Sequence, residues 1–360
     1  MIKVLELFGG IGACSKALEN LGIEHEIVDC VEIDKFAIKS FNAIHNTNFD
    51  AQDIKTWDKN IDVNLIMHGS PCQDFSVAGK QQGGDEGSGT RSSLMFETLR
   101  IVEKLKPDYV IWENVKNLLS KNHVHNFEEY IRRMALLGYG SIWKVLNAKD
   151  YGIPQNRERI FTISSRRRVL TLGDFPEPKE LKTKLKDILE DNVDEKYYLS
   201  KEKMEMISKW NCYEQPLSHI MTTDSISKTI TTRVGAESGG MKCVAIRTAN
   251  KQGYDLATNG DGIDLAYINS STRRGRVGHG ISKTLECSDT MGCLQNYRVR
   301  KLTPKECFRL MGFSDEDYEK CSKVNSSSQL YKQAENSIVV NVLDEILKKL
   351  YMEEQNETTK

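Results

Sequence analysis

Long hydrophobic runs are missing from this chain of 360 residues, and no apolar stretch approaches the roughly 18 residues that a membrane span needs. The sequence opens on a short strand-like pattern, not on the charged and apolar regions of a signal peptide. Cys-x-x-Cys pairs are also missing, although the chain has nine cysteines, which makes a structural zinc site unexpected. We therefore expect a cytoplasmic protein with free thiols, no bound metal and no membrane segment.

An excess of either charge is missing too, since 50 Lys and Arg residues face 51 Asp and Glu residues and the formal net charge is -1. A role with nucleic acids would therefore depend on local basic patches and not on overall charge. The hydrophobic content of 39% and the charged content of 28% are ordinary for globular proteins. The length favours two domains over one.

A glycine turn between a strand and a helix is the first ligand-binding pattern in the chain. Residues 3–8 form a hydrophobic strand pattern, Gly10 and Gly12 follow, and a helical pattern begins at Ala13. This order brings a ligand close to the backbone N–H groups at the start of a helix. The dinucleotide fingerprint is incomplete, because Ser15 stands in place of its third glycine.

Two acidic residues extend this pattern. A second strand, predicted over 25–31, ends at Glu32, which lies about 20 residues after Gly12, the distance at which a carboxylate accepts hydrogen bonds from a ribose. Asp53 follows a helix predicted over 36–44, in a loop where an adenine amino group can be bound. Together the glycine turn and Glu32 favour an adenosine-containing ligand, and an ordinary surface acid is the alternative.

Cys72 follows a short buried strand pattern over 63–68. The break that begins at Gly69 places Cys72 just past the carboxyl end of this strand, where open α/β sheets bind ligands. A partly exposed thiol in a polar setting is a candidate nucleophile, whereas a buried structural cysteine is the alternative. Residues 79–91 contain five glycines and suit a mobile lid or, alternatively, a plain surface loop.

A carboxylate and two arginines follow further along the chain. Glu113 comes directly after a strand pattern over 109–112, at another expected carboxyl edge. Arg157 and Arg159 lie between further strand patterns around 141–147 and 159–164. Because strands alternate with helices up to this point, we expect an α/β fold with a doubly wound sheet and right-handed crossovers.

The composition changes from about residue 175, where the chain becomes rich in Lys, Thr, Ser and Gly. Short β-prone runs occur at 228–233 and 282–285. The run 271–280 is basic and rich in glycine, which suits nucleic-acid contacts or, equally, a solvated loop. We expect a smaller, mostly β or irregular domain that serves recognition.

Regular structure is predicted again near the C-terminus. Thr303 is the expected N-cap of a helix, with Pro304 in its first turn and Glu306 completing a capping box. A last long helix is predicted to begin near Glu335. Its expected apolar face consists of Ile338, Val339, Val342, Ile346 and Leu350.

Taken together, these motifs resemble those of the cytosine-5 DNA methyltransferases, over nearly the whole chain outside residues 175–280. The matching segments, in the order of that family, are 8–12 (Phe-Gly-Gly-Ile-Gly), 71–73 (Pro-Cys-Gln), 113–115 (Glu-Asn-Val), 155–159 (Gln-Asn-Arg-Glu-Arg), 302–313 and 336–340 (Asn-Ser-Ile-Val-Val). The resemblance implies a Rossmann-like methyltransferase domain over 1–174 plus 301–360 and a target-recognition domain over 175–300. One departure is Glu335, where the family has glycine, since its side chain would crowd or repel the methionine end of the cofactor.

The resemblance implies methyl transfer from S-adenosylmethionine to carbon 5 of cytosine. The Cys72 thiolate would add to carbon 6, and Glu113 would deliver or share a proton at ring nitrogen 3. Arg157 and Arg159 would hold the base carbonyl, orient Glu113 and favour the thiolate. The residues expected to bind the cofactor are Phe8, Gly10, Gly12, Glu32, Asp53, Asn336 and Ser337.

The resemblance also implies double-stranded DNA as the partner. Carbons 5 and 6 of a paired cytosine lie within the base stack, so the target base must be flipped out. A monomer and a place in a bacterial or phage restriction-modification system are further implications. The residues expected to contact DNA are Gln73, Ser76, Arg91, Arg273, Arg274 and Arg276.

Three alternatives remain open from the sequence. One branch of the same family methylates tRNA with the same residues, but the long variable region before Leu302 favours a DNA reader. A catalytically silent DNA-binding regulator would keep the fold without needing an intact Cys72 or Glu113. A nicotinamide-dependent oxidoreductase is disfavoured by the incomplete glycine fingerprint.

Overall fold

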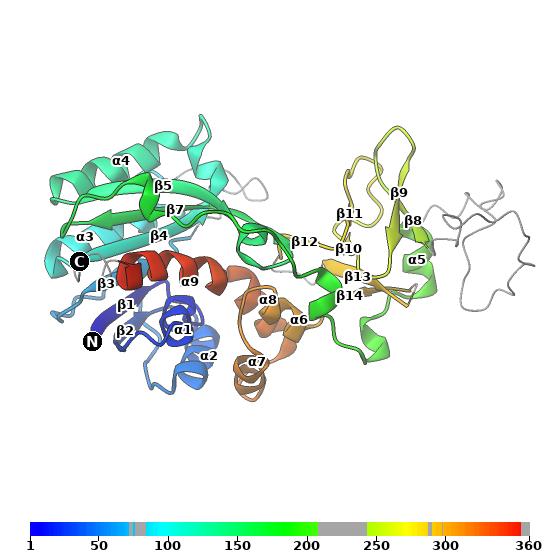
Figure 1. Ribbon diagram of the computed structural model, residues 1–360, viewed down its shortest axis with the longest axis horizontal. Helices are drawn as coiled ribbons and strands as arrows, with labels where there is room; N and C mark the ends of the chain where they lie inside the picture. The colour runs from blue at the N-terminus through cyan, green and yellow to red at the C-terminus, as the bar shows by residue number, and fades with distance from the viewer. Residues whose placement is uncertain (72–74, 76–83, 208–242, 287–289, 297, 354–360) are drawn as a thin grey trace, which may run out of the picture. The chain divides into compact units, whose positions relative to one another are not determined.

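The computed structural model describes residues 1–71, 75, 84–207, 243–286, 290–296 and 298–353. The chain divides into two compact units (Figure 1). The first unit comprises Met1–Ile153, Arg157–Glu180 and Met311–Lys360, and the second comprises Pro154–Asn156 and Leu181–Leu310. The assignment of catalysis and DNA reading to separate domains stays a prediction.

A six-stranded sheet forms the centre of the first unit, in the order β2-β1-β3-β4-β7-β5. The first four strands of this order are parallel, whereas β7 runs antiparallel between β4 and β5. The expected α/β class is confirmed, with one antiparallel strand in the sheet. The strands are β1 (Ile2–Leu7), β2 (His25–Val31), β3 (Leu65–His68), β4 (Tyr109–Val115), β5 (Gly140–Asn147) and β7 (Glu158–Ser165).

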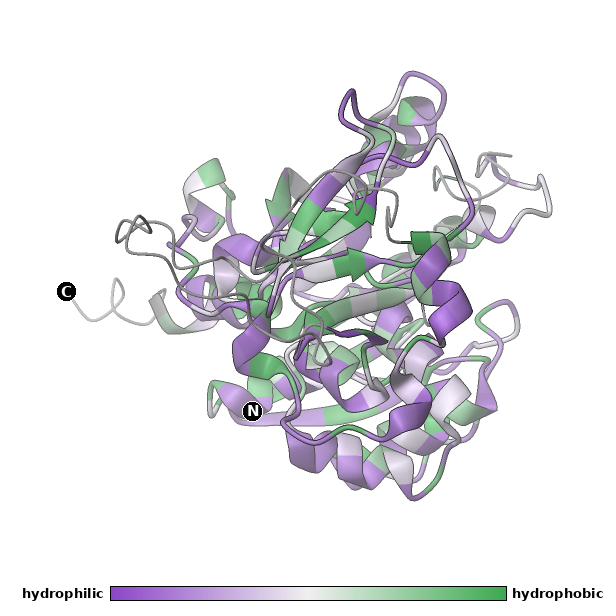
Figure 2. Ribbon diagram, turned by 90° about the vertical axis from the view of Figure 1, so that its right-hand side faces the viewer, coloured by the Kyte–Doolittle hydropathy of each residue, from purple (hydrophilic) through white to green (hydrophobic). Residues whose placement is uncertain are grey.

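Helices pack on the sheet because its strands carry apolar residues on both faces. On one face, α3 (Met95–Leu105) and α4 (Val124–Leu136) join Val110 and Trp112 of β4 in one large hydrophobic cluster. Leu5 and Leu7 of β1 belong to the same cluster. Figure 2 shows hydrophobic residues along the strands and hydrophilic residues on many outward helix surfaces.

The helices after β1 and β2 connect these strands to the rest of the sheet. α1 (Ala13–Asn20) follows the glycine turn. α2 (Lys35–His45) begins where the Asp34 side chain accepts a hydrogen bond from the Phe36 N–H, and it ends at Asn46 in the left-handed conformation. The helix packs Phe41 against Cys30 of β2. The helix predicted over 36–44 is therefore confirmed.

β4 is longer than the sequence pattern predicts. The pattern ends the strand at Trp112, but β4 continues to Val115, so Glu113 lies inside it. β3 pairs with β4 only as far as His68 and Trp112, whereas antiparallel β7 continues the ladder through Val115. The second neighbour extends the strand, and Glu113 lies just beyond the carboxyl end of β3.

The predicted start of the last helix was wrong. Glu335 lies in α8 (Ser327–Asn336), and the final α-helix, α9 (Val340–Lys348), begins only after a break. Ser337 has extended backbone there, with φ -74° and ψ 160°. Its carbonyl accepts a hydrogen bond from Arg157, which is distant in the sequence. A tertiary contact that helical periodicity does not encode therefore accompanies the break.

The second unit contains a four-stranded sheet in the order β11-β10-β13-β14 and two smaller sheets, β8 with β9 and β6 with β12. Its core is a cluster that includes Ile246, Ile263 and Leu294. The β-prone run 282–285 forms a strand over its first two residues, whereas 228–233 lies outside the described residues. The strands are β6 (Gln155–Asn156), β8 (Cys243–Arg247), β9 (Tyr254–Thr258), β10 (Gly262–Asp264), β11 (Val277–Gly278), β12 (Ser282–Lys283), β13 (Met291–Gln295) and β14 (Arg298–Lys301).

The helix start predicted at Thr303 is confirmed. α6 (Pro304–Arg309) has the full capping box, because Thr303 Oγ1 accepts from the Glu306 N–H and Glu306 Oε2 accepts from the Thr303 N–H. The Glu306 carboxylate also accepts hydrogen bonds from Arg300, with Nη2 2.6 Å from Oε1 and Nη1 2.8 Å from Oε2. Both side chains are fully buried. The cap is thus part of a buried ion pair.

Within the described ranges, no helix is both long and apolar enough to cross a membrane. The same residues contain no group of three or more His, Cys, Asp or Glu side chains that could hold a metal ion. Among the described residues, Cys14, Cys30, Cys293, Cys307 and Cys321 form no disulfide bond.

Candidate active site

The predicted nucleophile segment leaves the sheet at the end of β3. Cys72, Gln73 and Ser76 lie outside the described residues. The backbone that leads to them is placed, since Gly69 and Ser70 follow β3 directly at the carboxyl edge of the sheet.

Ser70 is held by β4. It is buried, and its Oγ accepts a hydrogen bond from Trp112 Nε1 at 3.0 Å. Its carbonyl accepts a second bond from Asn114 Nδ2 at 3.2 Å. The two side chains flank Glu113 on the same strand, so β4 fixes the chain two positions before Cys72.

Glu113 lies beside this segment. A Cβ built on Gly69 would be 3.9 Å from Glu113 Oε2, so the two residues are neighbours. Glu113 is buried, and burial raises the pKa of its carboxyl. The charges of Arg159 and Arg157 oppose that rise in the pKa, whereas Glu335 adds to it. A carboxyl in this setting is suited to share a proton with a bound ring.

Arg159 reaches Glu113 from the neighbouring strand. The β4–β7 register pairs Arg159 with Val115, and the Arg159 Nε lies 3.2 Å from Glu113 Oε1. Both side chains are largely shielded from solvent, with 15% and 11% exposure. The ion pair fixes the direction of the carboxyl group. The structure therefore brings together two of the predicted catalytic residues.

Arg157 holds the break between α8 and α9. Its guanidinium is buried, and Nη2 donates to the carbonyls of Glu335 and Ser337, both at 3.0 Å. Ser337 is buried, while Asn336 beside it is exposed. These contacts bring the Gln-Asn-Arg-Glu-Arg segment, 155–159, together with the Asn-Ser-Ile-Val-Val segment, 336–340. A contact of Arg157 with a base stays a prediction.

The glycine turn after β1 has the backbone that its composition predicts. Gly10 and Gly12 have φ of 57° and 84°, a left-handed conformation that favours glycine. Nothing lies within 4 Å of the point that a Cβ on Gly10 would occupy, so the turn has open space there. A Cβ on Gly12 would lie 2.1 Å from His45 Nε2. Phe8, just before the turn, also has a positive φ of 52°.

Glu32 and Asp53 lie next to this turn. The Glu32 carboxylate accepts a hydrogen bond from the Gly10 N–H at 3.2 Å and another from the Asp34 N–H at 2.8 Å. Burial raises the pKa of Glu32, and the two backbone bonds oppose that rise. The Glu32 carbonyl accepts from the Gln52 N–H at 2.8 Å, which places exposed Asp53 directly after this contact.

The glycine turn on one side, and Ser70 with Glu113 on the other, lie at the ends of adjacent parallel strands. The glycine turn follows β1, Ser70 follows β3, and Glu113 lies near the end of β4, in neighbouring positions of the sheet. The carboxyl ends of parallel strands meet at one edge. This edge therefore offers an open glycine turn with an acid suited to a ribose, beside a buried carboxyl suited to proton transfer.

The predicted recognition arginines differ in their surroundings. Arg273 donates twice to Asp264 Oδ2, at 3.0 and 2.8 Å. Arg276 is 1% exposed and donates to three backbone carbonyls, so a DNA contact would require these bonds to break. Arg274 is exposed, as is Arg91 in the first unit. Their roles stay predictions.

The sequence did not predict the role of two residues that make contacts at the carboxyl edge of the six-stranded sheet, Ser70 and His45. Ser70 had a signal, namely its place immediately before the Pro71-Cys72 motif. His45, whose ring contacts the Gly12 turn, had none, because it lies on another helix and its approach depends on the packing of α2.

The motif order and the edge geometry agree with comparisons with known proteins. A family model described as C-5 cytosine-specific DNA methylase matches residues 2–352. The orphan methyltransferase M.SPRI of Bacillus phage SPR is 30% identical, with 97% of each chain covered. The type II methyltransferase M.HhaI of Haemophilus parahaemolyticus is 33% identical, with 96% of this chain and 93% of the relative covered.

The structure resembles that of the S. pombe Dnmt2 methyltransferase, with a TM-score of 0.60 and 19% identity over 99% of this chain and 100% of the other. At this identity the likeness concerns the fold alone, and it confirms the Rossmann-like methyltransferase architecture. The family model and the curated relatives, in contrast, cover nearly the whole chain. The chain therefore belongs to the C-5 cytosine-specific DNA methylase family and is a DNA (cytosine-5-)-methyltransferase.

Proposed function

We propose that this enzyme transfers a methyl group from S-adenosylmethionine to carbon 5 of a cytosine flipped out of double-stranded DNA. The reaction proceeds through a covalent bond between Cys72 and carbon 6 of the base. The observation that carries the proposal is the position of Glu113, which is paired with Arg159 and lies against Gly69 at the start of the Cys72 segment.

The glycine turn supports S-adenosylmethionine as the cofactor. It has open space beside Gly10, and it leads directly into the N-terminus of α1. Glu32 is suited to the ribose hydroxyls and exposed Asp53 to the adenine amino group. When bound, the cofactor supplies a methyl group on a positively charged sulfur. The residues proposed to hold it are Phe8, Gly10, Gly12, Glu32, Asp53, Asn336 and Ser337.

Cys72 and Glu113 divide the chemistry between them. The Cys72 thiolate adds to carbon 6, which moves electron density to carbon 5 and makes it nucleophilic enough to take the methyl group. Protonated Glu113 shares its proton with ring nitrogen 3 while negative charge builds on the base. A base then removes the proton from carbon 5, and Cys72 leaves as the thiolate.

The arginines and Ser70 act by positioning and by charge. Arg159 orients Glu113 and, with Arg157, provides the positive surroundings that favour a thiolate at Cys72. Ser70 is fixed by Trp112 and Asn114 and so limits where Cys72 can lie.

The substrate in this proposal is double-stranded DNA with a short specific target, bound by a monomer in a bacterial or phage-infected cell. The bacterial and phage origin of the relatives supports that setting. Exposed Arg274 is suited to a phosphate or a guanine, and Arg273 to a phosphate. The residues proposed to contact DNA also include Gln73, Ser76, Arg91 and Arg276.

Transfer of a labelled methyl group tests the nucleophile. The wild-type enzyme, given labelled S-adenosylmethionine, should label unmethylated bacterial DNA but not tRNA. Cys72→Ser should lose about a thousand-fold or more of this activity and still bind DNA, because only the covalent step is removed. Near-normal turnover in Cys72→Ser, or label in tRNA alone, would contradict the proposal.

A further inference from the structure

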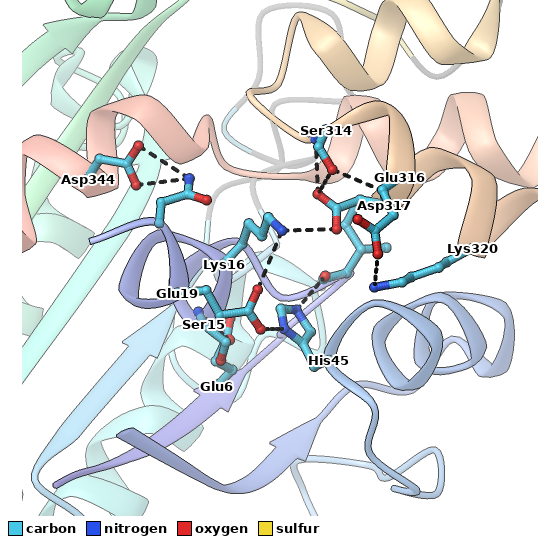
Figure 3. A network of polar contacts seen from close by, with 12 residues as sticks. Glu6, Ser15, Lys16, Glu19, His45, Ser314, Glu316, Asp317, Lys320 and Asp344 are labelled. Atoms are coloured by element: carbon cyan, nitrogen blue, oxygen red, sulfur yellow. Dashed lines mark hydrogen bonds and ion pairs between the residues drawn. The ribbon is translucent and has the colours of Figure 1, made fainter. Parts of the chain in front are cut away.

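His45 lies at the end of α2, against the glycine turn. Its side chain is fully buried, and its ring packs on Phe41 with 4.7 Å between centroids. The ring fills the space beside Gly12, where a Cβ would lie 2.1 Å from Nε2. Figure 3 shows the ring next to Glu19 of α1. No step of the proposed reaction uses this histidine.

Both ring nitrogens of His45 face acceptors. Nε2 lies 3.2 Å from the carbonyl oxygen of Ile11, within the glycine turn. Nδ1 lies 3.1 Å from Glu19 Oε1. A carbonyl and a carboxylate can only accept, and a neutral imidazole has a single N–H, whereas an imidazolium has two. Only the protonated ring satisfies both contacts.

The charged groups around His45 come from three elements. Glu19 and Lys16 lie on α1 and form an ion pair. Lys16 Nζ also lies 3.0 Å from Asp317 Oδ1 of α7 (Asp315–Ser322), with which it forms a second ion pair. Glu6 lies on β1, buried, and accepts hydrogen bonds from the N–H and Oγ of Ser15. Figure 3 shows this network.

His45 acts on the pKa of both neighbouring glutamates. Burial alone would raise the pKa of Glu19, but the hydrogen bond and charge of His45, with Lys16, lower it below its usual value. Burial raises the pKa of Glu6, and the His45 charge opposes that rise.

We propose that His45 is a positioning residue for the cofactor-binding turn, which it holds through the Ile11 carbonyl while its ring is protonated. The inference rests on the proposed role of the turn in binding S-adenosylmethionine. The Ile11 carbonyl belongs to the peptide that joins Ile11 to Gly12, so the hydrogen bond fixes the orientation of that peptide. Cofactor affinity is therefore coupled to the protonation of a residue that does not touch the cofactor.

The sign of the coupling follows from the two acceptors. When the ring loses a proton, the one that remains stays on Nδ1, because the Glu19 carboxylate is a stronger acceptor than a carbonyl. Nε2 then presents a lone pair to the Ile11 oxygen, and the turn is released. Affinity for S-adenosylmethionine should thus fall with rising pH, as the ring loses its proton. Ionisation of Glu32 acts in the opposite direction, because its carboxylate accepts from the ribose.

The test is calorimetric titration of the 360-residue protein with S-adenosylmethionine from about pH 6 to about pH 9. The wild-type dissociation constant should rise by at least about five-fold, the lower end of common couplings between linked sites. His45→Gln should remove this rise, since its amide N–H can still reach Ile11 and does not titrate. His25→Gln, a histidine at the far end of β2, should keep the wild-type profile.

Glu19→Gln provides a second variant in case His45→Gln does not fold. Glu19 is partly exposed, and its loss removes the carboxylate that favours the protonated ring. The wild-type fall in affinity should therefore move to lower pH. Unchanged profiles in both variants, with cofactor still bound, would overturn the role of His45 alone. Absence of wild-type binding at every pH would instead overturn the cofactor site and this inference with it.

Discussion

Glu113 is a buried carboxyl that forms an ion pair with Arg159 and has a raised pKa. In the proposed mechanism its protonated form shares a proton with the base. The protonated fraction falls as the pH rises through the raised pKa, so methyl transfer should fall with it. Glu113→Gln should lose about a hundred-fold or more of the activity and lack this high-pH decline. Single-turnover methyl transfer against pH measures both effects.

Glu335 provides a matched variant for this prediction. Its negative charge helps to raise the pKa of Glu113, so Glu335→Gln should lower that pKa. The high-pH decline of activity should then begin at lower pH, with the plateau below it retained. A decline that stays in place in Glu335→Gln, or moves to higher pH, would contradict the assignment of the decline to Glu113.

Glu32 tests the cofactor site at the same scale. Glu32→Ala removes the carboxylate that accepts from the Gly10 N–H, and it should weaken S-adenosylmethionine binding by about ten-fold or more. Affinity for DNA should change little. Exposed Asp50 provides a control, since Asp50→Ala should leave the cofactor titration unchanged. An unaltered titration in Glu32→Ala would refute its role at the ribose.

At the scale of elements, the buried Arg300–Glu306 pair joins β14 to the start of α6. Glu306→Ala leaves a buried guanidinium without its carboxylate and should lower the free energy of unfolding by about 3–5 kcal/mol. Thr303→Ala removes the capping hydroxyl, which also donates to Glu190 Oε2, but keeps the ion pair, and it should cost about 1 kcal/mol. Urea unfolding measures both variants. Equal losses of unfolding free energy in the two variants would show that the cap, and not the ion pair, stabilises the start of α6.

The elements that the sequence predicts are those that depend on local pattern. The capping box at Thr303 and α2 were predictable because their signals lie within a few residues. The end of β4 was not, because it depends on pairing with β7. The break before α9 was not either, because Arg157 makes its contact with Ser337 through the tertiary fold.

At the scale of the whole molecule, the order of the motifs predicted the family, which the family model and the relatives confirm. The motifs predicted which strand ends carry acids, and the sheet order brings these ends together. The surroundings of each side chain could not be predicted in the same way. Arg276 looked like a surface arginine of a basic loop, but it is buried among backbone carbonyls. His45 gave no signal at all.

The most direct test of the account is bisulfite sequencing of DNA from a bacterial host that lacks cytosine methylation and expresses this protein. The account predicts protected cytosines in one short sequence context, and none in cells that express Cys72→Ser at the same level. Complete conversion of cytosine in cells that contain folded wild-type protein would contradict it.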